Sequence, residues 1–197
     1  MKVHAESLLQ VGVILGIGLI GTSLLWELVI QQHSPQWFDA PVLFDTLLGL
    51  GIGWLSGWAV WVLGARLPAT LEIRARLLAT FDFAHFKRWH VVALALVAAV
   101  PEEIFFRGTL QPEIGIILTA LIFGALHSLT LTYFIYATVA GLGLGLMADW
   151  HGTLWMPIAA HFAVDYVSLM ALVTWAGQQE PPLDELNHPT FSAETYP

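Results

Sequence analysis

Long apolar segments are the feature that most constrains what this chain can fold into. A helix that spans a lipid bilayer needs about 20 mainly apolar residues, because the hydrocarbon core is about 30 Å thick and each helical residue rises about 1.5 Å. The sequence therefore predicts an all-α, polytopic membrane helix bundle with about six transmembrane helices, formed by a single domain over residues 1–176. The predicted spans are Leu8–Ile30, Val42–Gly64, His90–Leu110, Ile114–Leu131, Tyr133–Trp150 and Thr153–Trp175.

Composition agrees with a membrane protein. Of the 197 residues, 57% are hydrophobic and 11% are charged, whereas a soluble domain carries about 25% charged residues. The seven Lys and Arg form no face that neutralises phosphates, so nucleic acid is not an expected partner. The chain has no cysteine, which excludes disulfides and thiolate chemistry. The segment 177–197 is acidic and contains proline, and we expect a poorly ordered tail there.

The basic residues predict an orientation in the membrane. The connection 65–89 holds five of the seven Lys and Arg, so the positive-inside rule places it in the cytoplasm. Six spans then put both termini on the cytoplasmic side of the cell (inner) membrane. Within this connection, Leu71–Phe83 is loosely amphipathic, a pattern typical of either an interfacial helix or an ordinary charged loop.

The third predicted span contains ionisable residues, which are costly in a bilayer and usually mark function. Glu103 and Arg107 are four residues apart and can pair on one helix face. Glu102 points about 100° away and lacks that partner. Burial without a partner disfavours the ionised carboxylate, which makes Glu102 suited to proton transfer. An ion-paired kink after Pro101 is the structural alternative, but it does not account for Glu102.

Two further predicted spans carry polar residues at comparable depth. Counted from the nearest outer turn, Glu102, Glu103 and His161 lie about 14 Å deep. Asp165 lies about 20 Å deep and His127 about 22 Å deep by the same rise. His161 and Asp165 are four residues apart and share a face. We therefore expect these residues to meet in one polar cavity inside the bilayer.

Three motifs in this order resemble one known family. The resemblance covers residues 91–170 and is to the CPBP family, also called the CAAX protease and bacteriocin-processing or Abi family. The motifs are Glu102-Glu103-x-x-x-Arg107, Phe123-x-x-x-His127 and His161-x-x-x-Asp165.

The resemblance implies a glutamic-type intramembrane endopeptidase with a polar cavity. Glu102 together with His127 would activate a water molecule that attacks a peptide carbonyl, and Glu103 with Arg107 would hold the site in shape. Such groups act strongly in a cavity shielded from lipid and water. The implied partners are membrane lipid and a membrane-associated peptide or protein. Prenylated CaaX proteins and leader peptides are both compatible with such a cavity.

The resemblance also implies that His161 and residue 165 stabilise the oxyanion, and here the chain departs from the family. Many members have Asn where this chain has Asp165, and an amide donates a hydrogen bond that an ionised carboxylate cannot. A protonated Asp165 would donate one. Orientation of His161 and binding of a cation are the other roles open to it.

Metal dependence and two other functions remain as alternatives. Zinc takes His nitrogen and carboxylate oxygen, and Glu102, His127 and His161 are the candidate ligands. The sequence lacks HExxH, and a mechanism without metal or other cofactor is the preferred hypothesis. A non-catalytic binding or immunity protein is the second candidate function. A proton- or cation-coupled transporter is the third, although the two halves of the chain show no repeat.

Overall fold

The computed structural model describes residues 2–32, 36–38 and 42–178, and these residues form a helical bundle without strands. The polytopic helical fold is therefore confirmed. Apart from Gly177 and Gln178, the predicted polar tail lies outside the described residues. Five helical stretches are long and apolar enough to cross a membrane: Ala5–Ile30, Val42–Gly64, Arg88–Ile114, Leu131–His151 and Trp155–Gly177.

The helices follow the predicted spans closely in four of the six cases and extend the third. The third stretch continues past its predicted end through a π-helical segment and a further short helix. In chain order the elements are α1 (Ala5–Leu25), η1 (Trp26–Ile30), α2 (Val42–Gly64), α3 (Pro68–Thr80), η2 (Phe83–His85), α4 (Arg88–Glu103), η3 (Ile104–Leu110), α5 (Gln111–Ile114), α6 (Ile116–Leu126), α7 (Leu131–His151) and α8 (Trp155–Gly177).

The fourth predicted span is the exception, because Ile114–Leu131 does not form one long helix. Its helix, α6, has 11 residues, about 16 Å at the usual rise, which is too short to cross a bilayer. Gly115 precedes α6 with a positive φ of 81°. After α6, the Thr130 side chain accepts a hydrogen bond from Tyr133 N and caps α7. The chain therefore reverses before a full crossing.

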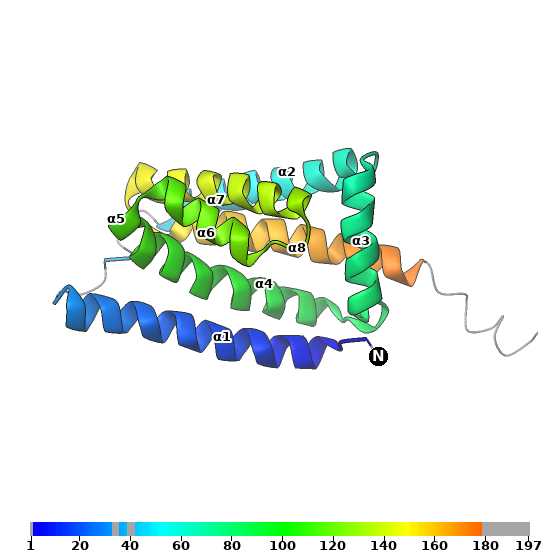
Figure 1. The fold of residues 1–197 in the computed structure, drawn as a ribbon, viewed down its shortest axis with the longest axis horizontal. Helices are drawn as coiled ribbons and strands as arrows, with labels where there is room; N and C mark the ends of the chain where they lie inside the picture. The colour runs from blue at the N-terminus through cyan, green and yellow to red at the C-terminus, as the bar shows by residue number, and fades with distance from the viewer. Residues whose placement is uncertain (1, 33–35, 39–41, 179–197) are drawn as a thin grey trace, which may run out of the picture.

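The elements are arranged so that both described ends of the chain lie together. In Figure 1 the long helices run side by side, and α3 crosses one end of the bundle. The N-terminus and the end of α8 lie at that same end. Val3 N donates to Thr80 O at 2.8 Å, which ties the start of the chain to the end of α3. The segment Leu71–Phe83 was predicted to be either an interfacial helix or a charged loop. Most of it is helical, since α3 extends to Thr80.

Glycine lets α2 approach α8 closely. A Cβ added to Gly49 would meet the carbonyl of Met156, and one added to Gly53 would meet the carbonyl of Ala160. A side chain at either position would push α8 outward, so these glycines set the distance between the two backbones. Ala160 directly precedes His161, and α2 therefore fixes the helix that carries this predicted site residue.

The outer surface of the bundle is strongly apolar. Ile14, Leu43 and Leu131 expose 68%, 72% and 74% of their surface, although all three are large hydrophobic residues. In water such an exposed surface is unfavourable, whereas in a bilayer it contacts acyl chains. Together with the five apolar helices, these faces make the chain an integral, multi-pass membrane protein.

Candidate active site

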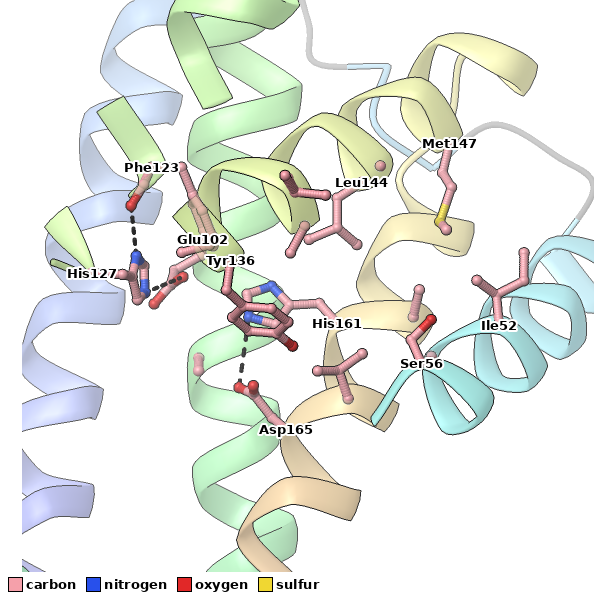
Figure 2. Close-up of a pocket in the computed structure, with 18 of the residues that line it drawn as sticks. Ile52, Ser56, Glu102, Phe123, His127, Tyr136, Leu144, Met147, His161 and Asp165 are labelled. Atoms are coloured by element: carbon pink, nitrogen blue, oxygen red, sulfur yellow. Dashed lines mark hydrogen bonds and ion pairs between the residues drawn. The ribbon is translucent and has the colours of Figure 1, made fainter. Parts of the chain in front are cut away.

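Four of the six predicted site residues line one cavity of about 500 Å³ inside the bundle. Glu102 reaches it from α4, His127 from the end of α6, and His161 and Asp165 from α8 (Figure 2). The remaining two, Glu103 and Arg107, do not line it. The convergence expected from depth along the helices is therefore found for these four residues.

Glu103 and Arg107 form a fully buried pair behind the cavity. Arg107 Nη1 donates to Glu103 Oε1 at 2.8 Å, and both side chains are 0% exposed. Arg107 Nη2 also donates to the carbonyl of Gly141 on α7 at 3.1 Å. The Arg107 guanidinium carbon lies 4.6 Å from the ring centre of Phe123. This cluster ties together α4, η3, α6 and α7, as a structural support would.

His161 is held from behind by the same carboxylate. Its Nδ1 lies 2.7 Å from Glu103 Oε1, the atom that also accepts from Arg107. Glu103 carries the charge that pairs with Arg107, so its oxygen accepts and His161 Nδ1 is the donor. The other ring nitrogen, Nε2, lies 3.6 Å from Asp165 Oδ2. A protonated His161 would therefore present an Nε2–H on the side of Asp165.

His127 has its tautomer set by the backbone. Its Nδ1 lies 2.7 Å from the carbonyl oxygen of Phe123, and because a carbonyl can only accept, Nδ1 carries the proton. In the neutral ring, Nε2 is then an acceptor. It lies 3.7 Å from Glu102 Oε2, as the dashed line in Figure 2 shows. Glu102 Oε2 is buried and has no hydrogen-bond partner among the described residues.

This pair of acceptors is arranged to hold a water molecule. Two acceptor atoms 3.7 Å apart do not bond to each other, but both lie within reach of a water placed between them. Such a water would donate one hydrogen to Glu102 and the other to His127. Its oxygen lone pairs would then be free to attack a substrate in the cavity.

Sequence reasoning missed the residues of α7 that take part in the site. Tyr133 and Tyr136 line the cavity, and Gly141 supplies a carbonyl to Arg107. Gly141 lies against Ala120 and Phe123 of α6, and Gly145 lies against Gln111 and Ile116. No pattern in the sequence marks the two tyrosines, because aromatic residues near the end of a membrane helix usually serve as interfacial anchors.

The three candidate zinc ligands, Glu102, His127 and His161, all line the cavity. Among the described residues, however, no group of three or more His, Asp and Glu is placed to hold a metal. His161 has its Nδ1 engaged by Glu103.

Fold and cavity together define a polytopic membrane protein with an acid–histidine site between its helices, and comparison with known proteins shows what the segment around this site resembles. Residues 84–167 match the family of type II CAAX prenyl endopeptidase Rce1-like proteins. This segment contains all six predicted site residues, and over it the resemblance to the CPBP family of intramembrane proteases is confirmed.

One curated relative is similar in sequence. Over 81 residues the chain is 44% identical to the uncharacterized protein YpbD of Bacillus subtilis (strain 168). The matched stretch covers 40% of this chain and 43% of YpbD, so it spans less than half of either protein. No solved structure matches this chain.

Proposed function

We propose that this chain is an intramembrane endopeptidase that hydrolyses a peptide bond in a membrane-associated peptide or protein. One observation carries the proposal. Within the described part of the chain, the buried Oε2 of Glu102 has no hydrogen-bond partner, and it faces the acceptor nitrogen of His127 across 3.7 Å at the wall of a cavity of about 500 Å³. The family match over residues 84–167 supports the same class of activity.

In the proposed reaction, water is the nucleophile and Glu102 is the general base. The water oxygen forms a bond to the carbonyl carbon of the scissile peptide, and its proton passes to the Glu102 carboxylate. The tetrahedral intermediate collapses with cleavage of the C–N bond. Glu102 then returns the proton to the leaving nitrogen, which gives a carboxylic acid and an amine. His127 orients the water through its Nε2 acceptor.

His161 and Asp165 are the proposed environment of the oxyanion. A protonated His161 would donate from Nε2 to the developing negative charge, and such preorganised donors contribute strongly in a site without bulk water. Asp165 lies 3.6 Å from this nitrogen and can hold the ring in place. Glu103 and Arg107 do not reach the substrate in this scheme and act as positioning residues.

The walls of the cavity and the family match support a proposed substrate class. Apart from the acids, histidines and tyrosines, the lining is mostly apolar, which suits a prenylated CaaX peptide or an apolar leader peptide. We also propose that α3 lies at the cytoplasmic face of the cell membrane. The connection 65–89 holds most of the basic residues, and both described ends of the chain lie beside α3.

The test is cleavage of a mixed peptide library that includes prenylated peptides, with purified protein in lipid. Wild type is expected to cleave members of the library and Glu102→Gln is not. A parallel reaction with a chelator is expected to proceed at the same rate, and loss of cleavage there would overturn the metal-free mechanism. No cleavage by folded wild type would instead favour the non-catalytic binding protein, for which the carboxylate of Asp165 in the oxyanion environment is the specific observation.

A further inference from the structure

A second cavity lies against the first. It has a volume of about 580 Å³ and shares four residues with the candidate active site: Tyr133, Tyr136, Val164 and Asp165. From these it extends to α3, the helix that crosses the end of the bundle. Its other walls are almost entirely apolar and include Leu8, Trp61, Leu77, Phe83, Leu169 and Leu172. A chain leaving the candidate active site past Asp165 would enter this apolar space.

Besides Asp165, which both cavities share, Arg74 on α3 brings a charged side chain to the wall of the second cavity. It is only 7% exposed. Its Nη2 donates to the carbonyl of Trp61 at 2.5 Å, and its guanidinium carbon lies 3.7 Å from the centre of the Trp61 ring. A guanidinium has five N–H donors, so most of them remain available.

Arg74 has no carboxylate partner among the described residues. The neighbouring acids are engaged elsewhere, since Glu72 pairs with Arg76 and Asp82 lies against His4 and His85. Buried charges in proteins are generally paired, because removal from water is costly. The carbonyl and ring of Trp61 compensate only part of that cost, so the cavity contains a cation suited to an anionic ligand.

We propose that the second cavity binds the carboxyl-terminal segment of the substrate, with Arg74 holding its free carboxylate. The proposal rests on the proposed function and assigns the part of the substrate that follows the scissile bond. Apolar walls suit aliphatic side chains, and guanidinium binds carboxylate through two parallel hydrogen bonds. Because the two cavities share a wall, one extended peptide can place its scissile carbonyl at Glu102 and its terminus at Arg74.

A purely structural role for Arg74 makes a different prediction. Trp61 lies in the last turn of α2, whose carbonyls lack partners within the helix, and Arg74 caps one of them. If capping were its whole function, removal of Arg74 would lower the binding affinity for every ligand by the same factor. Recognition of a carboxylate, by contrast, discriminates a peptide acid from the same peptide ending in an amide.

The experiment therefore compares two probes that differ only at the C-terminus. They are a fluorescent, farnesylated Cys-aliphatic-aliphatic-alanine peptide with a free carboxylate, and its C-terminal amide. Binding is measured by fluorescence anisotropy to Glu102→Gln protein in lipid nanodiscs, so that no probe is cleaved. The acid is expected to bind about tenfold more tightly than the amide, since a charge-assisted bond is stronger than a neutral one.

Added to this background, Arg74→Gln is expected to abolish the preference for the acid and to leave binding of the amide unchanged. Arg76→Gln removes the same charge from an exposed position of α3 and is expected to retain the full preference. Arg74→Lys keeps the charge and a donor for Trp61 but loses the fork geometry. It is expected to retain a smaller preference, and it tests the proposal if Arg74→Gln does not fold.

The proposal would be overturned if the Glu102→Gln protein that retains Arg74 bound the acid and the amide equally. It would also be overturned if the preference for the acid survived in Arg74→Gln. Oleate and oleamide are compared in the same way. If oleate alone shows the Arg74-dependent preference, the cavity is a lipid site and the peptide assignment is wrong. These readings do not depend on turnover, so failure of the subsite and failure of the peptidase function are distinguishable.

Discussion

Two acid–histidine pairs of this bundle, Asp45 with His151 and Glu102 with His127, differ in how completely the carboxylate is bonded. Asp45 is 0% exposed and has both oxygens engaged, by His151 Nδ1 at 2.5 Å and by Thr153 Oγ1 at 3.0 Å. It joins the first turn of α2 to the connection between α7 and α8. Glu102, in contrast, has a buried oxygen that makes no hydrogen bond to any described residue and lies 3.7 Å from His127 Nε2.

The comparison shows that residue types alone do not make a catalytic site. Asp45 and His151 have the same chemistry as Glu102 and His127, but Asp45 lines neither of the two cavities described above. Both Asp45 oxygens already accept a hydrogen bond from a neighbouring side chain, whereas Glu102 Oε2 accepts none from the described residues. We therefore expect the Asp45 cluster to hold helices together, and Glu102 with His127 to activate water.

The largest expected difference is between the two histidines. His127→Ala is expected to lower peptide cleavage by at least about 10²-fold, because the water that Glu102 activates loses the acceptor that orients it. His151→Ala is expected to leave the rate per folded molecule nearly unchanged, because His151 does not line the cavity with Glu102. Initial rates with purified protein in lipid check both. Similar losses in the two variants would erase the distinction between the clusters.

The buried ion pair behind the site gives the next largest effect. Arg107→Met is expected to destabilise the fold by roughly 3–5 kcal/mol, because it leaves Glu103 buried without its cation. Thermal unfolding in detergent measures this, with Arg76→Met as the control. Arg76 pairs with Glu72 at the surface, where both side chains are more than half exposed, so its loss is expected to change stability little. An unfolding midpoint unchanged by Arg107→Met would contradict the supporting role.

The Asp45 cluster is expected to contribute stability without activity. Asp45→Asn keeps the shape of the side chain but removes its charge, which weakens two buried hydrogen bonds. A loss of about 1.5–3 kcal/mol is expected, the range for hydrogen bonds to charged groups. Two quantities are measured for Asp45→Asn and for wild type: the midpoint of thermal unfolding and the rate of peptide cleavage per folded molecule. A variant as stable as wild type but inactive would reverse the assignment of the two clusters.

A third acid–histidine cluster lies at the surface and is expected to contribute least. Asp82 Oδ1 lies 3.0 Å from His85 Nδ1, and Oδ2 lies 3.4 Å from His4 Nδ1. The hydrogen bond from His85, with the nearby positive charges, holds the pKa of Asp82 below its usual value. Its stabilisation is therefore present above the unfolded pKa of about 3.9 and is lost as the pH falls through the lower folded pKa.

For Asp82→Asn, we expect a loss of less than about 1 kcal/mol at pH 5, because solvent screens exposed pairs. The difference from wild type should be smaller at about pH 3, where Asp82 is partly protonated, than at pH 5. Unfolding midpoints at the two pH values measure it. A difference that grows toward low pH would show that the ionised carboxylate is not the stabilising form.

How far the sequence could predict this protein varied along the chain. Val42–Gly64 was predicted with the bounds that the structure has, because a mainly apolar run of that length, with Asp45 as its one charged residue, forms a helix in a bilayer. Ile114–Leu131 is nearly as apolar, and nothing in its hydropathy shows that the helix stops at Leu126. The pairing of Glu103 with Arg107 follows from their spacing, but the second partner of Glu103, His161, is 58 residues away.

The sequence by itself determined the class of fold, the residues that lie at unfavourable depth, and the motifs of the family, since hydropathy and helical spacing are local properties. Only the tertiary structure decided which carboxylate is satisfied and which is not. Asp45 and Glu102 are both acids in apolar helices, and the difference between them comes from partners distant in the chain. Arg74 acquires its place beside the second cavity in the same way, through the packing of α3 across the end of the bundle.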